Sequence, residues 1–263
     1  HTPAGKTDFA VSLDRMASQL PRLEAASLVV SWFGGDLRCG DCRLQPKVED
    51  AEIEGENMPW SVSGLTRGAA EVIAQADGRP IYGGTPADAA VLEAIAALKE
   101  AGKAVMFYPF ILMDQTEGNA LPDPYSDAAT QPHLPWRGRI TLSEAPGRPG
   151  SPDGTAAAEA EVAAFFGTVT AADFTVGDGA VSYHGPEEWT LSRFILHYAA
   201  LCAAAGRVEA FCISAEMRGP QRIRGAGNGF VACRALTPPL NATEPDTTRK
   251  RGGEGEAHKQ ERQ

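Results

Sequence analysis

Apolar residues follow two alternating patterns along the chain as far as about residue 215. In one pattern they recur three or four positions apart, as on the buried side of an amphipathic helix. In the other they form short runs rich in β-branched and aromatic residues, as in buried strands. The helical pattern covers residues 7–20, 65–76, 85–102, 151–166 and 187–205, and the apolar runs cover residues 27–33, 80–83, 104–113 and 211–215. This alternation predicts an α/β fold with parallel strands.

Local signals refine several of these elements. Thr7 can cap the first helix, and Thr85-Pro86-Ala87-Asp88 has the hydroxyl, proline and acidic residue expected, in that order, at a helix N-terminus. A small glycine-rich hairpin is predicted over residues 174–183. Pro109 lacks the N–H group of a ladder hydrogen bond, so we expect strand pairing to loosen there.

Two segments lack an apolar period. Residues 115–152 are rich in proline, glycine and aspartate and are longer than an ordinary connection. The aromatic residues Tyr125 and Trp136 predict that this insertion packs over the open end of the strands. Residues 225–263 are polar and rich in charge, so we expect a disordered tail after a folded domain formed by residues 1–224.

The most informative local pattern is the helix of residues 187–205, the glycine stop Gly206, the apolar run and the strand-end carboxylate of Glu216. This order is typical of a (β/α) barrel, in which catalytic groups stand at the carboxyl ends of the strands. The four apolar runs account for about four β/α units, and a closed barrel needs roughly twice as many. The sequence therefore predicts a partial TIM-barrel-like fold.

Composition excludes several classes of function. The chain has 263 residues and a formal net charge of −10, so it offers no basic stripe for nucleic acid. No apolar run is long enough to cross a bilayer. The histidines have no metal-ligand spacing and phosphate-binding glycine motifs are missing, so we expect neither a metal nor another cofactor. Because the chain starts with His1 rather than methionine, we expect a fragment or a processed product.

Cys39 and Cys42 form a Cys-Gly-Asp-Cys sequence in a predicted loop. No second pair of ligands completes a zinc site, and the pair does not open a helix as thioredoxin-like chemistry requires. A local disulfide or two ordinary thiols would account for these residues. Cys202 and Cys212 fall on apolar faces and are expected to fill the core.

Three carboxylates follow predicted strands, those of Asp36, Asp114 and Glu216. If the strands are parallel, all three project toward one rim. Hydrolysis of a glycosidic bond needs two such groups, one as the acid and one as the nucleophile or base. Trp32 and Tyr108 offer faces on which a sugar ring could stack, but filling of the barrel interior is the favoured explanation for these aromatic residues.

Glu216 has two interpretations at this point. It is a candidate general acid because of its place at the end of a strand. Alternatively, it forms a structural ion pair with Arg218 or Arg222, which follow it closely.

Several stretches resemble a known family. Two of them are Ser27-Leu-Val-Val-Ser-Trp-Phe-Gly-Gly-Asp-Leu-Arg-Cys-Gly-Asp-Cys42 and Phe211-Cys-Ile-Ser-Ala-Glu-Met-Arg-Gly219, and others lie at residues 77–91, 107–114, 119–125, 135–141 and 193–199. They resemble the glycoside-hydrolase-like TIM-barrel domain of gene transfer agent and phage tail proteins, the large host-specificity or "megatron" proteins of phage-like particles. The resemblance runs from about residue 7 to residue 224 and covers the N-terminal part of that domain.

The resemblance implies that Glu216 matches the family's strand-end acid/base and that Asp36 or Asp114 would have to supply the second carboxylate. Trp32, Tyr108 and Trp136 would then contact the glycan. The family's domain continues with further β/α units where this chain has its tail. We therefore expect a truncated form without catalytic competence.

The implied setting is the tail of a phage-like particle assembled in the bacterial cytoplasm. Its partners would be other tail proteins and bacterial surface glycan, with no nucleic acid and no membrane span. Two alternatives stay open: a non-catalytic structural or receptor-binding domain of the tail hub, and the remnant of a decayed prophage gene.

Overall fold

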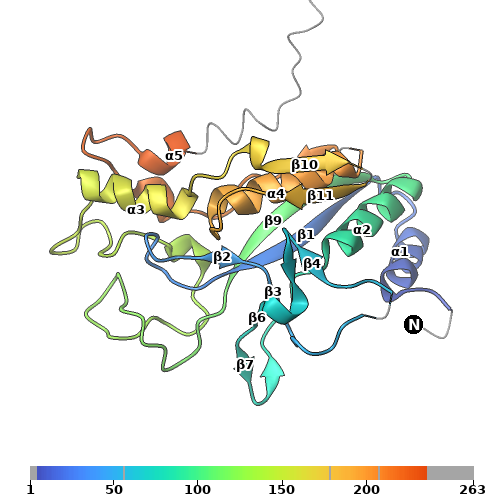
Figure 1. Cartoon of the computed structure of the whole chain (residues 1–263), viewed down its shortest axis with the longest axis horizontal. Coiled ribbons are helices and arrows are strands. Elements are labelled where there is room, and N and C mark those ends of the chain that lie inside the picture. Colours follow the sequence, from blue (N-terminus) through green and yellow to red (C-terminus); the bar gives the residue numbers. More distant parts are fainter. Residues whose placement is uncertain (1–4, 56, 178, 207, 236–263) are drawn as a thin grey trace, which may run out of the picture.

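The computed structural model describes residues 5–55, 57–177, 179–206 and 208–235 (Figure 1). These residues form a mixed α/β fold whose main helices are α1 (Asp8–Gln19), α2 (Asp88–Glu100), α3 (Ala156–Phe166), α4 (Leu191–Ala204) and α5 (Val231–Ala235). The main sheet contains β1 (Ala25–Gly34), β2 (Leu44–Gln45), β9 (Ala104–Met113) and β12 (Ala210–Phe211).

The sheet has the strand order β12-β9-β1-β2. β1 and β9 pair in parallel over ten residues, from Ala25 opposite Ala104 to Gly34 opposite Met113. β12 pairs in parallel with the other edge of β9, and β2 pairs antiparallel with the end of β1. The three parallel strands are thus neighbours in chain order, but the described residues form a small open sheet and no closed barrel. The partial barrel stays a prediction.

The helices α2 and α4 cover one face of this sheet. Alternate residues of β9 are buried, and the buried Phe107 packs on Tyr198 of α4, with 5.2 Å between the ring centroids. Trp32 is fully buried on the same face and donates a hydrogen bond from Nε1 to the Tyr198 hydroxyl at 2.9 Å. His197 Nε2 lies 2.9 Å from Asp88 at the start of α2, which ties the two helices together.

Pairing does not loosen at Pro109, which stays in register opposite Val30. The carbonyls of Val105 and Phe107 point toward β12 and accept hydrogen bonds from Glu209 and Cys212. The missing N–H of Pro109 faces this same edge, where β12 has already ended, so the pairing with β1 loses nothing.

The helix predicted over residues 65–76 and the strand predicted over residues 80–83 are wrong. This region forms short ribbons instead: β3 (Lys47–Val48) with β6 (Glu71–Val72), β4 (Ser61–Val62) with β5 (Leu65–Thr66), and β7 (Gln75–Ala76) with β8 (Arg79–Pro80). The turn between β7 and β8 is Asp77-Gly78, with φ of 51° and 72°. Asp-Gly with positive φ at both positions is a strong hairpin signal, and it overrides the weak helical period. One of the four expected β/α units is therefore missing.

Most of the other predicted elements are present, but the helices start at later residues than predicted. The hairpin of residues 174–183 is confirmed as β10 (Phe174–Gly177) and β11 (Ala180–Tyr183). Thr7 caps α1 as expected, and its hydroxyl accepts a hydrogen bond from Ala10 N. Thr85 does not cap α2, because its hydroxyl instead donates to Ser31 O and accepts from Lys47 N. α3 starts later than expected, and Thr155 caps it.

Part of the predicted tail is folded. Phe230 forms a β-bridge with Arg224, and the short helix α5 that follows contacts α3. Ala232 is buried there, so this apolar contact extends the ordered chain past the expected boundary at residue 224. The remainder of the tail, residues 236–263, lies outside the described residues.

The cysteines are free thiols, so the disulfide alternative for Cys39 and Cys42 is not adopted. Burial raises the pKa of both thiols, to about 12 for Cys42, and it raises the pKa of Cys202 to about 12. Cys233 is exposed on α5, and Cys212 is half-buried.

Thiol labelling tests this arrangement. In the native protein at pH 8 we expect rapid labelling of Cys233, slower labelling of Cys212 and none of the three buried thiols, because they are inaccessible and stay protonated. Mass spectrometry after unfolding without reductant should find all five cysteines labelled. Three labelled cysteines under those conditions would indicate a disulfide between Cys39 and Cys42.

The bond between Trp32 and Tyr198 should contribute measurably to stability. Tyr198→Phe leaves the buried indole N–H of Trp32 without its acceptor and should lower the free energy of unfolding by about 1–3 kcal/mol. Urea denaturation measures the change. Tyr108→Phe is the matched control, because it removes the same atom from a half-buried residue whose hydroxyl has no hydrogen bond to any described residue. Equal effects of the two changes would contradict this role.

Candidate functional site

Glu216 stands at the carboxyl end of the sheet but not on a strand. Regular pairing of β12 ends at Phe211, and the chain continues as an irregular segment to Glu216. Its backbone has φ of 57°, in the left-handed region that non-glycine residues rarely adopt. The side chain is 55% exposed. Oε2 accepts a hydrogen bond from Trp136 Nε1 at 2.7 Å and forms an ion pair with Arg137 Nη2 at 2.8 Å.

Arg137 joins three parts of the chain at this point. It belongs to the short 3₁₀ helix η2 (Arg137–Arg139), and its side chain is only 8% exposed. The guanidinium lies 3.7 Å from the ring centroid of Phe110 on β9, and Nε donates to Ala215 O. The insertion of residues 115–152 therefore does pack over the ends of β9 and β12. Glu216 forms its ion pair with Arg137 and not with Arg218 or Arg222.

Asp36 and Asp114 lie at the same end of the sheet, since Gly34 and Met113 pair at the ends of β1 and β9. Both are buried, and each has its own cation. Asp36 accepts two hydrogen bonds from the Arg38 guanidinium and one from Gln131 Nε2 at 2.7 Å. Asp114 is ion-paired with Lys47 at 2.9 Å. Neither carboxylate is available to a ligand in this arrangement.

The three aromatic residues proposed for substrate contact occupy different environments. Trp32 is fully buried in the core and presents no surface to a ligand, because α4 covers it. Tyr108 is half-buried on the opposite face of β9, where its ring meets Phe110 edge to face. Trp136 is 43% exposed and lines a pocket beside Glu216.

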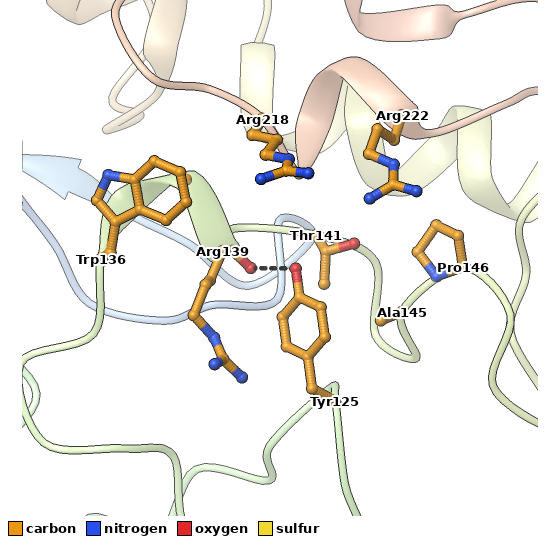
Figure 2. A pocket seen from close by; sticks show the side chains of 10 residues that line it. Tyr125, Trp136, Arg139, Thr141, Ala145, Pro146, Arg218 and Arg222 are labelled. Atoms are coloured by element: carbon orange, nitrogen blue, oxygen red, sulfur yellow. Dashed lines mark hydrogen bonds between the residues drawn. The ribbon is translucent and has the colours of Figure 1, made fainter.

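This pocket has a volume of about 260 Å³ and lies between the insertion and the short 3₁₀ helix η4 (Pro220–Arg222) (Figure 2). Arg218 and Arg222 extend from the η4 side toward Tyr125 and Thr141, and Trp136 stands at one end (Figure 2). The remaining lining residues are Gly138, Arg139, Ala145, Pro146 and Gly219. The Tyr125 hydroxyl donates a hydrogen bond to Arg139 O at 2.9 Å.

Gly219 allows the two walls of the pocket to approach. Its N–H donates to Gly138 O at 2.8 Å, and a Cβ at this position would collide with the carbonyl oxygens of Ile140 and Gly138. The glycine that closes the Glu-Met-Arg-Gly sequence thus brings η4 against η2. The sequence does not reveal that Arg139, Arg218 and Arg222 line one pocket. The two walls are some 80 positions apart in the chain and meet only when it folds, as Trp136 and Glu216 do.

The described part of the chain offers no cluster of three or more His, Cys, Asp or Glu side chains arranged to hold a metal ion. Within the same residues, no helix combines the length and apolar character that a membrane crossing requires.

A family model described as the GTA TIM-barrel-like domain, where GTA denotes gene transfer agent, matches residues 189–242, about a fifth of the chain. This match supports the gene transfer agent TIM-barrel-like family. It indicates a gene transfer agent-associated protein, a component of such a particle. The matched segment contains α4, β12, Glu216 and η4, and therefore the arginine wall of the pocket. No curated protein matches the chain.

Substitutions at Glu216 separate its charge from its backbone conformation. Glu216→Ala leaves Arg137 without its counterion and keeps a Cβ at positive φ, and we expect a loss of about 1–2 kcal/mol in the free energy of unfolding. Glu216→Gly also removes the carboxylate but relieves the backbone, so it should be more stable than Glu216→Ala by about 1 kcal/mol. Chemical denaturation measures both. The interpretation of the strain is wrong if Glu216→Gly is the less stable variant.

Proposed function

We propose that this chain is a non-catalytic domain that contacts bacterial surface glycan at the tail tip of a gene transfer agent or related phage-like particle. The observation that carries the proposal is the pairing of Glu216 with Trp136 and Arg137 beside a pocket lined by aromatic and arginine side chains. Other tail proteins of the particle, assembled in the bacterial cytoplasm, would be its partners.

The arrangement of carboxylates supports binding rather than hydrolysis. Cleavage of a glycosidic bond needs one carboxyl group that donates its proton to the leaving oxygen and a second that attacks or activates water. Glu216 accepts a hydrogen bond from Trp136 and is ion-paired with Arg137, so its role in the structure is that of an acceptor and a counterion. Asp36 and Asp114 are buried against Arg38 and Lys47.

The pocket itself has the composition of a carbohydrate site. Sugars present apolar C–H faces and many hydroxyl groups, which aromatic rings and planar hydrogen-bond donors can engage together. Trp136 and Tyr125 supply the rings, and the arginines supply the donors.

A catalytic role for Glu216 is the second candidate. Its positive φ and 55% exposure favour this candidate, since strained, accessible residues cluster at functional sites. Such a role would require Asp36 or Asp114 to leave its buried ion pair, or a base from elsewhere.

Two measurements on the purified chain distinguish the candidates. We expect capsular and cell-wall glycans to bind in a solid-phase assay, and no reducing ends to be released. Trp136→Ala should weaken binding about tenfold, whereas Phe9→Ala, which removes a similarly exposed ring on α1, should leave it unchanged. Release of reducing ends that is lost in Glu216→Gln would establish the enzyme instead. The proposal fails if no glycan binds.

A further inference from the structure

We propose that the pocket between η4 and Tyr125 recognises an acidic sugar, with Arg218 and Arg222 holding its anionic group. This inference rests on the proposed glycan contact and specifies the chemical class of the glycan. The anion is a carboxylate or a phosphate carried by a sugar ring, because both fit the planar fork of an arginine.

The pocket carries an excess of positive charge. Neither the Arg218 side chain nor the Arg222 side chain makes a hydrogen bond or an ion pair with another of the described residues. By contrast, Arg38, Arg137 and Arg148 each have a carboxylate partner within 3 Å. Two uncompensated guanidinium groups that face one pocket are unexpected in a chain with a net charge of −10. They create a local positive potential that an anion would neutralise.

Nearby carboxylates do not cancel this potential. Glu216, which bonds to the pocket residue Trp136, is already paired with Arg137. Asp123 lies 3.9 Å from Arg139, whose guanidinium stacks over the Tyr125 ring at 4.4 Å from its centroid. Arg139 and Asp123 offset each other, so the excess charge belongs to Arg218 and Arg222.

The pocket wall also carries hydroxyl groups. The side chains of Tyr125 and Thr141 line the pocket together with Arg218 and Arg222. Hydroxyl groups next to guanidinium groups suit a ligand that carries both hydroxyls and an anionic group.

The size of the pocket limits the ligand that it can hold. A volume of about 260 Å³ lies just below the range of roughly 300–1,000 Å³ typical of small-molecule sites, so the pocket suits one sugar unit and not a buried oligomer. Trp136 at one end and Pro146 at the other offer apolar surface on either side of the arginines (Figure 2). A dense polyanion such as nucleic acid is disfavoured by the net negative charge of the chain.

Calorimetric titration with three matched oligosaccharides tests the proposal. The first contains a glucuronate unit, the second is the same oligosaccharide with the carboxylate reduced to an alcohol, and the third carries a phosphate on that unit. We expect the reduced form to bind at least about tenfold more weakly than the glucuronate form, and high salt to weaken only the acidic ligands. The preferred acidic ligand identifies the source of the anion.

Charge-neutral variants provide the second arm. Arg218→Gln and Arg222→Gln should each weaken binding of the preferred acidic ligand about tenfold and weaken binding of the reduced form much less, because the reduced form lacks the anionic group. Arg15→Gln is the matched control, because it removes the same charge from an exposed position on α1. Arg218 and Arg222 are exposed, so the variants should fold, and circular dichroism checks this.

The outcomes separate this inference from the proposed function. Equal affinity for the acidic and reduced forms overturns the acidic-sugar inference alone, as does a loss in Arg222→Gln no larger than that in Arg15→Gln. Failure of all three oligosaccharides and of the surface glycans to bind overturns the glycan contact as well.

Discussion

The parallel pairing of β1 with β9 is the constraint on which the rest of the structure depends. Its ten paired positions set both strands in one register and place Asp36 and Asp114 at the same end of the sheet. The same register aligns Trp32 and Phe107 on one face, where both rings meet Tyr198 of α4. A slip of one residue would turn these side chains to the other face and lose the buried hydrogen bond of Trp32.

The position of α4 then determines where the functional segment lies. α4 leads into β12, which is paired with β9 for only two residues before the chain leaves the sheet. What positions Glu216 and the following arginines is therefore not the sheet but the insertion, through Arg137, Trp136 and the close approach at Gly219. The pocket depends on contacts between segments that are distant in sequence, anchored on a sheet made largely of two strands.

The sequence predicts the elements whose apolar residues follow one clear local pattern and are buried by that same pattern in the folded chain. Residues 104–113 and 191–204 are continuous apolar or amphipathic runs, and each is a single element in the structure. Residues 65–83 were mispredicted because a weak helical period competed with Asp77-Gly78, whose backbone preference decides the turn. Thr85 shows a related limit, since a hydroxyl suited to a helix cap is engaged by Ser31 and Lys47.

The position of the three carboxylates at one end of the sheet was predictable, but their partners were not. Strand ends marked Asp36, Asp114 and Glu216, yet the cations that neutralise them come from a nearby loop, from β3 and from η2. No spacing in the sequence encodes the last two pairs. Likewise, Arg218 and Arg222 were expected to pair with Glu216 because they are close to it in the sequence. The folded insertion instead brings Arg137 to this carboxylate.

The choice of Arg137 as the ion-pair partner of Glu216 also affects the pocket. The ion pair with Arg137 and the hydrogen bond from Trp136 hold Glu216 against the insertion and support the wall that Trp136 contributes to the pocket. The pairing with Arg137 also leaves Arg218 and Arg222 without a protein carboxylate. One ion pair thus leaves a cationic surface on the pocket, and this surface is the basis on which we propose recognition of an anionic ligand.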